Sequence, residues 1–398
     1  MSQVSARLAS LSPAETLAMS QKSNELKARG IDVINLSVGE PDFYTPDHIK
    51  AAAEKAIKEN YSFYSPVPGY PALRNAIVAK LKKENNLDYK PEQIVCSNGA
   101  KQSVCNVILS VVGKGDEVIV PAPYWVSYVE MVKLAEGTNV VIEAGIEQDF
   151  KITPAQLEAA ITPKTKAIIL CSPSNPTGSV YSGEELKGFA DILAKHPNII
   201  ILSDEIYEHI NYVGQHESIA QFENIRDRVV VINGVSKGYA MTGWRLGWIA
   251  APQWIAAACS KLQGQYTSGP CSVTQKAAEA AYTGNQACVE QMRIAFERRK
   301  NLAVRLIKEI PGLKVNDPKG SFYIFPEADF YFGKKTPDGK VIKNAGELVM
   351  YLLEEGRVAS VGGAAFGAPK CIRFSYATSD ENLNEAFKRV KDALAKLS

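Results

Sequence analysis

The sequence predicts an α/β protein with a large domain, built on a mostly parallel sheet sandwiched by helices, and a smaller α+β domain. Four short apolar runs predict the sheet, at 118–120, 167–170, 199–202 and 229–232. Runs that are apolar on both faces are typical of parallel strands covered by helices. Helix-like segments alternate with these runs from about residue 90 to 290, which favours right-handed crossover connections.

Helices of the large domain are predicted from apolar spacing and from their first turns. Apolar residues recur at helical intervals after Pro71, at Leu73, Ile77 and Leu81. Two capping boxes, in which a hydroxyl precedes Glu or Gln by three residues, mark helix starts: Ser182 with Glu185, and Thr153 with Gln156.

The chain changes character from about residue 300. A strand is predicted at 322–325, a Gly- and Lys-rich loop at 333–343 and a helix at 345–356. A capping box of Thr378 and Glu381 is expected to open the last helix. Its apolar stripe comprises Leu383, Phe387, Val390, Leu394 and Leu397. The connection between the two parts, at 285–300, has a helical pattern rather than that of a linker.

Composition narrows the class of function. The 398 residues carry a formal net charge of +2, which provides no broad electrostatic surface for nucleic acid or an anionic membrane. The seven cysteines form no C-x-x-C pair, so we expect reduced thiols and a cytoplasmic protein. No N-terminal apolar core of a signal peptide and no run long enough to span a bilayer is present, so no membrane association is expected.

The residues that follow each apolar run form the candidate site, because open parallel sheets bind ligands beyond the carboxyl ends of their strands. These segments read PAPYWVSY, CSPSNPTG, SDEIY and NGVSKGYAMTGWRLG. They bring together two aromatic residues, an amide, a carboxylate and two cations: Trp125, Tyr207, Asn175, Asp204, Lys237 and Arg245.

This set matches the chemical needs of pyridoxal 5'-phosphate. Lys237 can form a Schiff base with the cofactor aldehyde, and Asp204 can keep the ring nitrogen protonated. Tyr207 and Asn175 can donate hydrogen bonds to the phenolate oxygen, while Trp125 can stack on the ring.

A phosphate site is predicted from Arg245 and three further positions. Arg245 offers a guanidinium fork and Ser236 a hydroxyl. Gly99 and Ala100 open a predicted helix, whose first amides can bind a phosphate. Small residues are needed there because the backbone must approach the phosphate closely.

Each of these residues has an ordinary alternative when taken alone. Lys237 could be a solvated charge, Asp204 a helix cap, Trp125 a core residue and Asn175 part of a turn. Their occurrence together at successive strand ends favours the site. The sequence has no G-x-G-x-x-G, G-x-x-x-x-G-K-[ST] or H-E-x-x-H, and its four histidines have no ligand spacing, so no metal is expected.

With these residues identified, the sequence strongly resembles the fold-type I, class I pyridoxal-phosphate-dependent aminotransferases. Within them it is most similar to the aspartate aminotransferases of the bacterial and prokaryotic-type plant branch. The resemblance runs nearly end to end and rests on eight segments: INLSVGEPDFYTP (34–46), YSPVPGYPALRNAI (64–77), NGAKQ (98–102), PYWVSY (123–128), SPSNPTG (172–178), SDEIYE (203–208), SKGYAMTGWRLG (236–247) and IRFSYATS (372–379).

The resemblance implies the same roles for the strand-end residues, with Lys237 also acting as the proton shuttle. It adds Arg373 as the clamp of the substrate α-carboxylate, helped by the Gly39 backbone. It also implies that Tyr64 reaches the cofactor phosphate of a partner subunit, and therefore a homodimer with shared active sites. The implied domains are a large cofactor-binding domain, 48–290, and a discontinuous small domain, 1–47 with 291–398.

Departures from the family bear on the substrate. Gln263 is expected where the animal and enteric branch has an arginine for the distal carboxylate. The other branch implies Lys101 and Thr16 for that role, although a serine often found two residues earlier is Ala14 here. Lys101 could instead be a neighbour of the cofactor phosphate or an exposed helix charge; the resemblance favours the substrate role.

The expected activity is amino-group transfer between aspartate or glutamate and 2-oxoglutarate or oxaloacetate, with ping-pong kinetics through pyridoxamine phosphate. An aromatic or prephenate aminotransferase, or a carbon-sulfur lyase on the same scaffold, is the alternative within enzymes. A non-catalytic pyridoxal-phosphate-binding regulatory module is the alternative in another class, but no basic helix-turn-helix segment is evident at either end.

Overall fold

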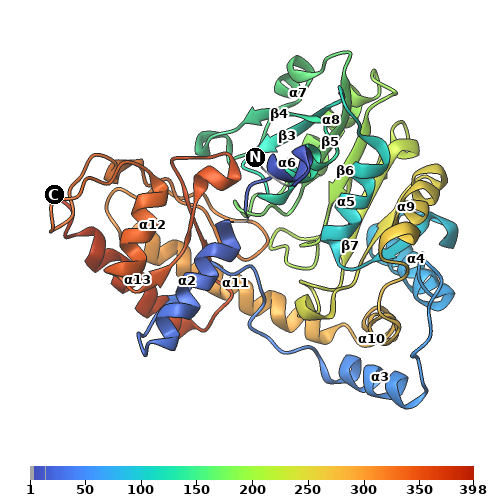
Figure 1. Ribbon diagram of the computed structural model, residues 1–398, viewed down its shortest axis with the longest axis horizontal. Coiled ribbons are helices and arrows are strands. Elements are labelled where there is room, and N and C mark those ends of the chain that lie inside the picture. Colours follow the sequence, from blue (N-terminus) through green and yellow to red (C-terminus); the bar gives the residue numbers. More distant parts are fainter. Residues whose placement is uncertain (1–3, 14) are drawn as a thin grey trace.

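The computed structural model describes residues 4–13 and 15–398, except for the side chains of residues 16 and 17. Figure 1 shows a large sheet with its helices beside a smaller group of helices and short strands. The helices are α1 (Ala6–Ala9), α2 (Glu15–Ala28), α3 (Asp47–Lys58), α4 (Pro71–Asn85), α5 (Ala100–Val111), α6 (Ser127–Leu134), α7 (Pro154–Ala160), α8 (Gly183–Leu193), α9 (Gln253–Tyr266), α10 (Ser272–Thr283), α11 (Ala287–Lys308), α12 (Ala345–Glu354) and α13 (Asp380–Leu394).

The strands fall into one large sheet and two small ones. The large sheet has the order β2-β8-β7-β6-β5-β3-β4. Its strands are β2 (Ile94–Ser97), β3 (Glu117–Ala122), β4 (Thr138–Glu143), β5 (Thr165–Cys171), β6 (Ile200–Asp204), β7 (Val229–Gly234) and β8 (Gly247–Ala250). The small sheets use β1 (Ile34–Asn35), β9 (Tyr323–Ile324), β10 (Val358–Ala359), β11 (Val361–Gly362) and β12 (Ile372–Ser375).

The predicted α/β architecture is confirmed. The four apolar runs form β3, β5, β6 and β7, which pair in parallel. Only β8 runs antiparallel to its neighbours, β7 and β2, so the sheet is mostly parallel. The prediction did not include this reversed strand, because β8 carries Gly247 and Trp248 rather than a run of β-branched residues.

Both faces of the large sheet are covered, which explains the continuous apolar character of its strands. In β7, Val229 and Val231 pack into one cluster with α4, α8 and α10. Val230 and Ile232 point the other way and pack with α5, α6 and α9. This alternation follows from the two-residue period of a strand. The result is a sheet sandwiched between two helical layers, and its carboxyl edge is left for a ligand.

The smaller part is held by a separate apolar cluster. It joins Met19, Val33 and Leu36 to side chains of α11, α12 and α13 and to the three-stranded sheet β11-β12-β9. β1 also pairs with β10, which brings the N-terminal segment to this part of the molecule. These contacts support the predicted discontinuous division, 1–47 with 291–398 against 48–290, which we keep as a proposal.

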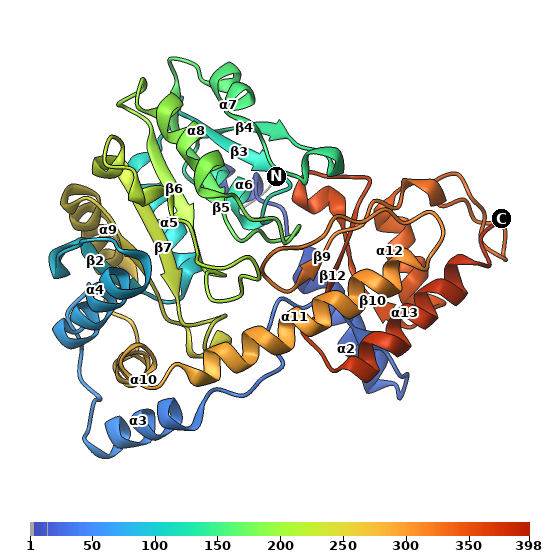
Figure 2. The same cartoon turned by 180° about the vertical axis from the view of Figure 1, so that it is seen from behind.

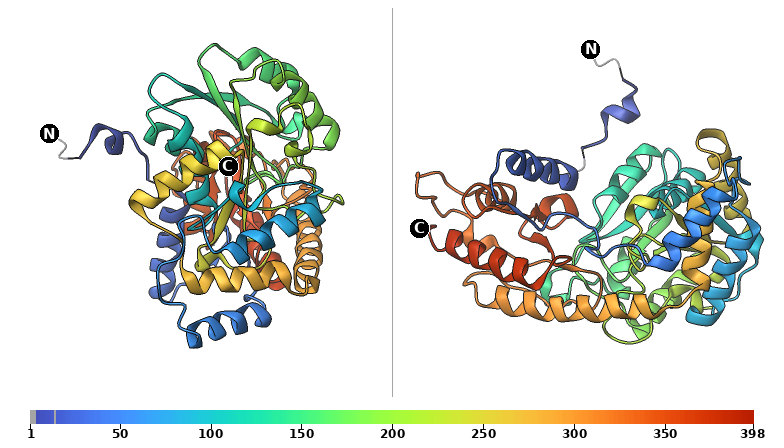
Figure 3. Two further views of the ribbon diagram at one scale, coloured as in Figure 1. Left: turned by 90° about the vertical axis from the view of Figure 1, so that its right-hand side faces the viewer. Right: turned by 90° about the horizontal axis from the view of Figure 1, so that it is seen from below.

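Helix α11 connects the two parts. It has 22 residues and runs under both, as Figure 2 and the right-hand view of Figure 3 show. Val289 near its start packs into the cluster of the large sheet, while Phe296 and Ile307 pack into the smaller one.

The predicted helix starts can be compared with the observed caps. Ser182 and Glu185, and Thr153 and Gln156, form the expected boxes. The predicted Thr378 and Glu381 box is wrong. The hydroxyl of Ser379 accepts the hydrogen bond from the Asn382 amide at 3.2 Å, because the chain enters α13 one residue later. Among the described residues, no helix is both long and apolar enough to cross a membrane.

One glycine of β8 fixes how closely α5 lies on the sheet. A Cβ on Gly247 would lie 2.1 Å from the backbone nitrogen of Ala100. Gly247→Ala must therefore push the start of α5 away, and we expect it to lower the free energy of unfolding by about 1–3 kcal/mol. Denaturant unfolding followed by circular dichroism measures this change.

The matched control is Gly264→Ala in α9. A Cβ there would meet Val67 at an ordinary distance of 3.6 Å. Alanine favours helix over glycine by about 0.5–1 kcal/mol, so this variant should be as stable as the wild type or more so. Equal stability of the Gly247→Ala variant would contradict the close approach.

Candidate active site

A cavity of about 270 Å³ lies at the carboxyl ends of β5, β6 and β7. It brings together most of the residues predicted from the sequence: Gly39, Ala100, Lys101, Trp125, Asn175, Asp204, Tyr207, Ser236, Lys237, Arg245 and Arg373. Gly99 adjoins it beside Arg245. Residues of the smaller part, Arg373 on β12 and Tyr323 on β9, close the side opposite the large sheet.

Lys237 follows β7 and extends its amine into the cavity. Its Nζ donates a hydrogen bond to the carbonyl oxygen of Gly39 at 2.6 Å. Burial lowers the pKa of Lys237 to about 8, and the positive charges of Arg373 and Arg245 act in the same direction. The amine of Lys237 therefore loses its proton at a lower pH than that of an ordinary lysine, which favours the unprotonated form that a nucleophilic lysine requires.

Asp204 is the last residue of β6. Its Oδ2 accepts a hydrogen bond from the Tyr128 hydroxyl at 2.5 Å, and its Oδ1 accepts one from the Ile206 amide at 3.2 Å. Burial raises the pKa of Asp204 to about 6, although the Tyr128 hydrogen bond opposes this shift. Lys237 is near enough to favour the charged form of Asp204, but within residues 4–13 and 15–398 no cation forms an ion pair with it. Such a buried carboxylate is suited to pair with a protonated ring nitrogen.

Arg373 lies on the opposite side of the cavity and is fully buried. Its guanidinium donates to Asn175 Oδ1 at 2.9 Å and to the Ser37 carbonyl at 2.7 Å. Within residues 4–13 and 15–398, no carboxylate lies within ion-pair distance of it and its Nε has no partner. Burial lowers the pKa of Arg373. Such a cation is ready to receive a ligand carboxylate.

Tyr207 and Asn175 are close to these charged groups. The Tyr207 hydroxyl shares a hydrogen bond of 2.9 Å with the Tyr323 hydroxyl. Burial raises the pKa of Tyr207 well above its usual range, so the phenol stays protonated and can donate. The side-chain oxygen of Asn175 is engaged by Arg373, which leaves its amide nitrogen for a ligand.

The phosphate end of the cavity is built from close backbone contacts. Gly99 caps α5 with a φ of +82°, and a Cβ there would lie 2.4 Å from the Arg245 guanidinium. Arg245 is held by the carbonyl oxygens of Thr242 at 2.8 Å and Asn98 at 3.3 Å. With Ser236 alongside, helix amides, a guanidinium and a hydroxyl converge as a phosphate requires.

Lys101 lies in the first turn of α5, at the rim of the cavity. Its Nζ is 4.9 Å from the centre of the Trp125 ring. Burial and the nearby charge of Arg245 lower the pKa of Lys101. Within residues 4–13 and 15–398, no acidic partner is found for it, so its charge is open to a ligand.

Two residues singled out from the sequence, Tyr64 and Gln263, lie outside the cavity, and two more cannot be placed. The Tyr64 side chain is 97% exposed and does not line the cavity of its own chain. The side chain of Thr16 and the whole of Ala14 lie outside the described residues. Gln263 is buried in α9, where it donates to the carbonyl oxygens of Val67 and Cys96, both at 2.9 Å. Gln263 is therefore a structural residue and cannot reach a substrate.

Sequence reasoning missed several residues of the site. Tyr128 is on the PYWVSY segment, three residues after Trp125, and the two rings pack edge to face at 5.3 Å. Its helical spacing from Trp125 was a usable signal. Cys171 and Glu40 line the cavity and lie within the quoted segments CSPSNPTG and INLSVGEPDFYTP, but no role was assigned to them. Tyr323 had no signal, because only the tertiary fold brings β9 to β6.

These residues fit pyridoxal phosphate. Lys237 offers the amine and Asp204 the carboxylate for the ring nitrogen, while Tyr207 and Asn175 offer donors. The Gly99 backbone, where a side chain would collide with Arg245, leaves room for a phosphate. The fold and site together thus define a pyridoxal-phosphate-dependent enzyme.

Comparisons with known proteins agree. The family model for aminotransferases of class I and II matches residues 31–390. A probable aspartate/prephenate aminotransferase of Rickettsia bellii is 48% identical, with 100% of each chain covered. The aspartate aminotransferase of Rhizobium meliloti has a crystal structure with a TM-score of 0.96, 40% identity and 100% coverage of each chain. The structure of the Thermus thermophilus aspartate aminotransferase with maleate has a TM-score of 0.92 and 37% identity, and the match covers 99% of this chain and 100% of that one.

The chain belongs to the class I and II aminotransferases, and it is a pyridoxal-phosphate-dependent aminotransferase.

The lowered pKa of Lys237 can be measured in the protein freed of cofactor. Below about pH 8 its amine is protonated and unreactive, and above that value it is free. Competitive acetylation of the apoenzyme, with peptides quantified by mass spectrometry, should therefore show Lys237 reactivity rising through about pH 8 and then levelling off.

Exposed Lys164 in the same digest provides the reference curve. A Lys237 curve still rising at about pH 10, the ordinary range for lysine, would contradict the effect of burial.

Proposed function

We propose that this aminotransferase exchanges the amino group of aspartate or glutamate with 2-oxoglutarate or oxaloacetate, in two successive half-reactions with ping-pong kinetics. The observation that carries the proposal is a pair of cations, Arg373 and Lys101, among the residues that line one cavity. A dicarboxylate needs such a pair. The relatives named for aspartate, and the Thermus thermophilus enzyme with maleate, support it.

The proposed roles start from the cofactor, which when bound supplies an electron sink that stabilises negative charge at the substrate Cα. Lys237 holds the cofactor and, once released, moves the proton at Cα. Asp204 keeps the ring nitrogen protonated, and Tyr128 holds the carboxylate in place. Tyr207 and Asn175 donate to the phenolate oxygen. Trp125 stacks on the ring.

The remaining proposed roles are binding of the cofactor phosphate and of the two substrate carboxylates. Gly99, Ala100, Ser236 and Arg245 bind the cofactor phosphate. Arg373 binds the substrate α-carboxylate, and the Gly39 backbone, which already accepts from Lys237, borders that site. Lys101, with Thr16 as its helper, binds the distal carboxylate. Lys101 adjoins Trp125 at the cavity.

Prephenate is a second candidate acceptor. It also carries two carboxylates, so the same pair of cations suits it. The Rickettsia bellii relative is named for both aspartate and prephenate. A carbon-sulfur lyase would not need a 2-oxo acid to restore its starting spectrum, which separates that alternative by experiment.

The shared active site of a homodimer is part of the proposal. Tyr64 is 97% exposed and neighbouring Phe63 is 80% exposed, which is unusual for aromatic side chains. A groove lined by Asn98, Trp244 and Arg245 adjoins the phosphate end of the cavity. Entry of a partner's Tyr64 there would complete the phosphate site. We also propose a cytoplasmic location, in keeping with the free state of all seven cysteines.

A single-turnover panel tests the substrate proposal. Aspartate, glutamate, alanine and phenylalanine are mixed with wild type and with Lys101→Met, and the cofactor spectrum is followed. A carboxylate that loses its charged donor loses about 1.5–3 kcal/mol. The variant should therefore lower kcat/KM for aspartate and glutamate by about ten- to a hundredfold, and for the other two far less.

The deciding quantity is the ratio of kcat/KM for aspartate to that for alanine. If this ratio is unchanged in the Lys101→Met variant, Lys101 does not recognise the distal carboxylate and is only a neighbour of the cofactor phosphate. Oxaloacetate, 2-oxoglutarate and prephenate are then added in turn to see which of them restores the starting spectrum.

Tyr64 is tested with hybrid dimers. Lys237→Ala subunits and Tyr64→Ala subunits should each have little activity alone. In a hybrid, the wild-type Lys237 of one subunit meets the wild-type Tyr64 of the other, so one complete site forms. Mixing after dissociation should restore up to about half of the activity per hybrid dimer. No recovery in hybrids isolated by differential tags would place Tyr64 at its own chain's site.

A further inference from the structure

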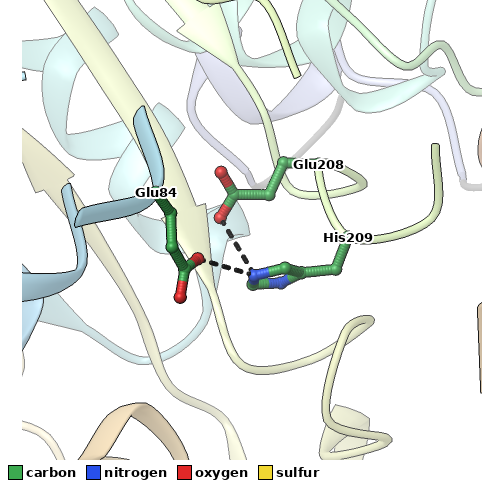
Figure 4. A group of neighbouring side chains, drawn as sticks. All are labelled: Glu84, Glu208 and His209. Carbon is green, nitrogen blue, oxygen red and sulfur yellow. Dashed lines mark hydrogen bonds and ion pairs between the residues drawn. The ribbon is translucent and has the colours of Figure 1, made fainter. Parts of the chain in front are cut away.

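A buried polar cluster lies behind the active-site turn that follows β6. Figure 4 shows Glu84, Glu208 and His209 with their side chains turned toward one another. His209 Nε2 lies 3.1 Å from Glu84 Oε2 and 3.8 Å from Glu208 Oε1. Three side chains of metal-ligand type meet here, outside the cavity that holds the substrate.

The cation of this cluster is a lysine of the chain itself. The Lys80 ammonium, from α4, makes a short contact with Glu208 and lies 2.7 Å from Asn85 Oδ1 and 3.6 Å from Glu84. The side chains of Lys80 and Glu208 are 1% and 4% exposed. Although burial alone would raise it, the Lys80 ammonium holds the pKa of Glu208 well below its usual range. The cluster is thus an ion pair that is charged on both sides.

Glu205 makes a second anchor on the same side of the turn. Its carboxylate accepts from the hydroxyls of Ser203 at 2.7 Å and Ser218 at 2.6 Å, and it contacts His216 Nε2 at 2.9 Å. Every one of these partners lies outside the cavity lining.

The turn therefore presents two faces. Asp204 and Tyr207 point into the cavity, while Glu205, Glu208 and His209 point away from it. Glu208 and His209 are tied to α4 through Lys80, Asn85 and Glu84. Each polar side chain of the turn is held by a hydrogen bond or ion pair on one face or the other, and such contacts are costly to leave unmade.

The same cluster also touches the segment that carries the catalytic lysine. A Cβ on Gly238 would lie 2.6 Å from His209 Nδ1, so the imidazole packs directly on the backbone next to Lys237. His209 further packs edge to face on Tyr239, with ring centres 5.5 Å apart. One polar cluster thus supports both the Asp204 turn and the Lys237 turn.

We propose that four residues act as positioning residues: Lys80, Glu208, Glu84 and His209. They hold the 204–209 turn and the Lys237 segment on the side away from the cavity. Asp204, Tyr207 and Lys237 are thereby kept at the positions from which they contact the cofactor. The inference rests on the proposed roles of those three residues. A buried ion pair contributes little net stability compared with apolar residues of similar volume, so a role in fixing geometry is the more specific function for it.

The experiment replaces the whole pair. Lys80→Met with Glu208→Leu removes both charges of the buried pair together, while the partly exposed Glu84 loses Lys80 but keeps His209 as a partner. Four quantities are measured with the holoenzyme: kcat with aspartate, the dissociation constant of pyridoxal phosphate, the pH titration of the cofactor absorbance, and the melting temperature. Lys300→Met with Asp317→Leu, which removes the 3.1 Å ion pair between α11 and the segment that follows it, is the control for loss of a Lys–acid pair away from the turn.

The double variant should keep a melting temperature near that of the wild type but lose about ten- to a hundredfold in kcat, the usual effect of misplacing catalytic groups. Its cofactor should dissociate more readily, and its absorbance should titrate at a shifted pH. The control variant should leave kcat, the cofactor affinity and the titration of the absorbance unchanged. A folded double variant with wild-type kcat, cofactor affinity and titration would overturn the proposal.

Two further variants keep the outcome clear. Glu84→Ala removes the anchor of His209 at a partly exposed position, so it should fold even if the double variant does not, and it should lower kcat with an unchanged melting temperature. A wild-type kcat in the Glu84→Ala variant would also contradict the positioning role of the cluster. Asp204→Asn is the reference: if it left turnover intact, the proposed role of Asp204 would fail, independently of the positioning cluster.

Discussion

Desolvated charge at the carboxyl edge of the large sheet is the constraint on which the rest of the site depends. Asp204, Lys237 and Arg373 are buried together, and burial disfavours the charged form of each, raising the pKa of the acid and lowering that of the two bases. Their protein contacts are hydrogen bonds to hydroxyl, amide and carbonyl groups rather than to opposite charges. A ligand with a cationic ring and an anionic carboxylate would supply the charged hydrogen-bond partners that Asp204 and Arg373 lack among the described residues.

Assembly of this edge requires both parts of the molecule. Lys237 from the large sheet donates to the Gly39 carbonyl, and Arg373 from β12 donates to Asn175, which follows β5. The hydroxyls of Tyr207 and Tyr323 join the same two parts. The residues proposed to bind the cofactor therefore come mainly from the large sheet, while the proposed α-carboxylate site is completed by the smaller part. Substrate binding and the relative placement of the two parts are consequently linked through direct hydrogen bonds.

The fold and much of the site could be predicted because local sequence determined them. Apolar runs placed β3, β5, β6 and β7, and the topology of parallel strands then brought Asp204 and Lys237 to one edge. The reversed β8 lacked such a run, and either Thr378 or Ser379 could have capped α13, so spacing alone could not choose. Tyr323, Ser37 and Lys80 reach their partners only across 116, 336 and 128 residues of chain. Contacts of that range depend on packing that no single-sequence pattern encodes. The roles of the site residues themselves, and the division into domains, stay predictions.

Helix α11 has a consequence for how the cavity can open. Among the described residues, the chain passes between the smaller part and the part with the large sheet once between Leu36 and Ile49 and again within α11, between Val289 and Met292. The turn after β6, with Ile206, Tyr207 and Ile210, also packs on the smaller cluster but returns to the large one at Ile219. The second crossing is one unbroken helix of 22 residues, about 33 Å long at 1.5 Å per residue. Two crossings define a line, and a body attached at both can swing about that line but cannot twist freely away from it. We therefore expect the cavity mouth to open and close by rotation of the smaller part about one axis, with α11 bending as the two parts move.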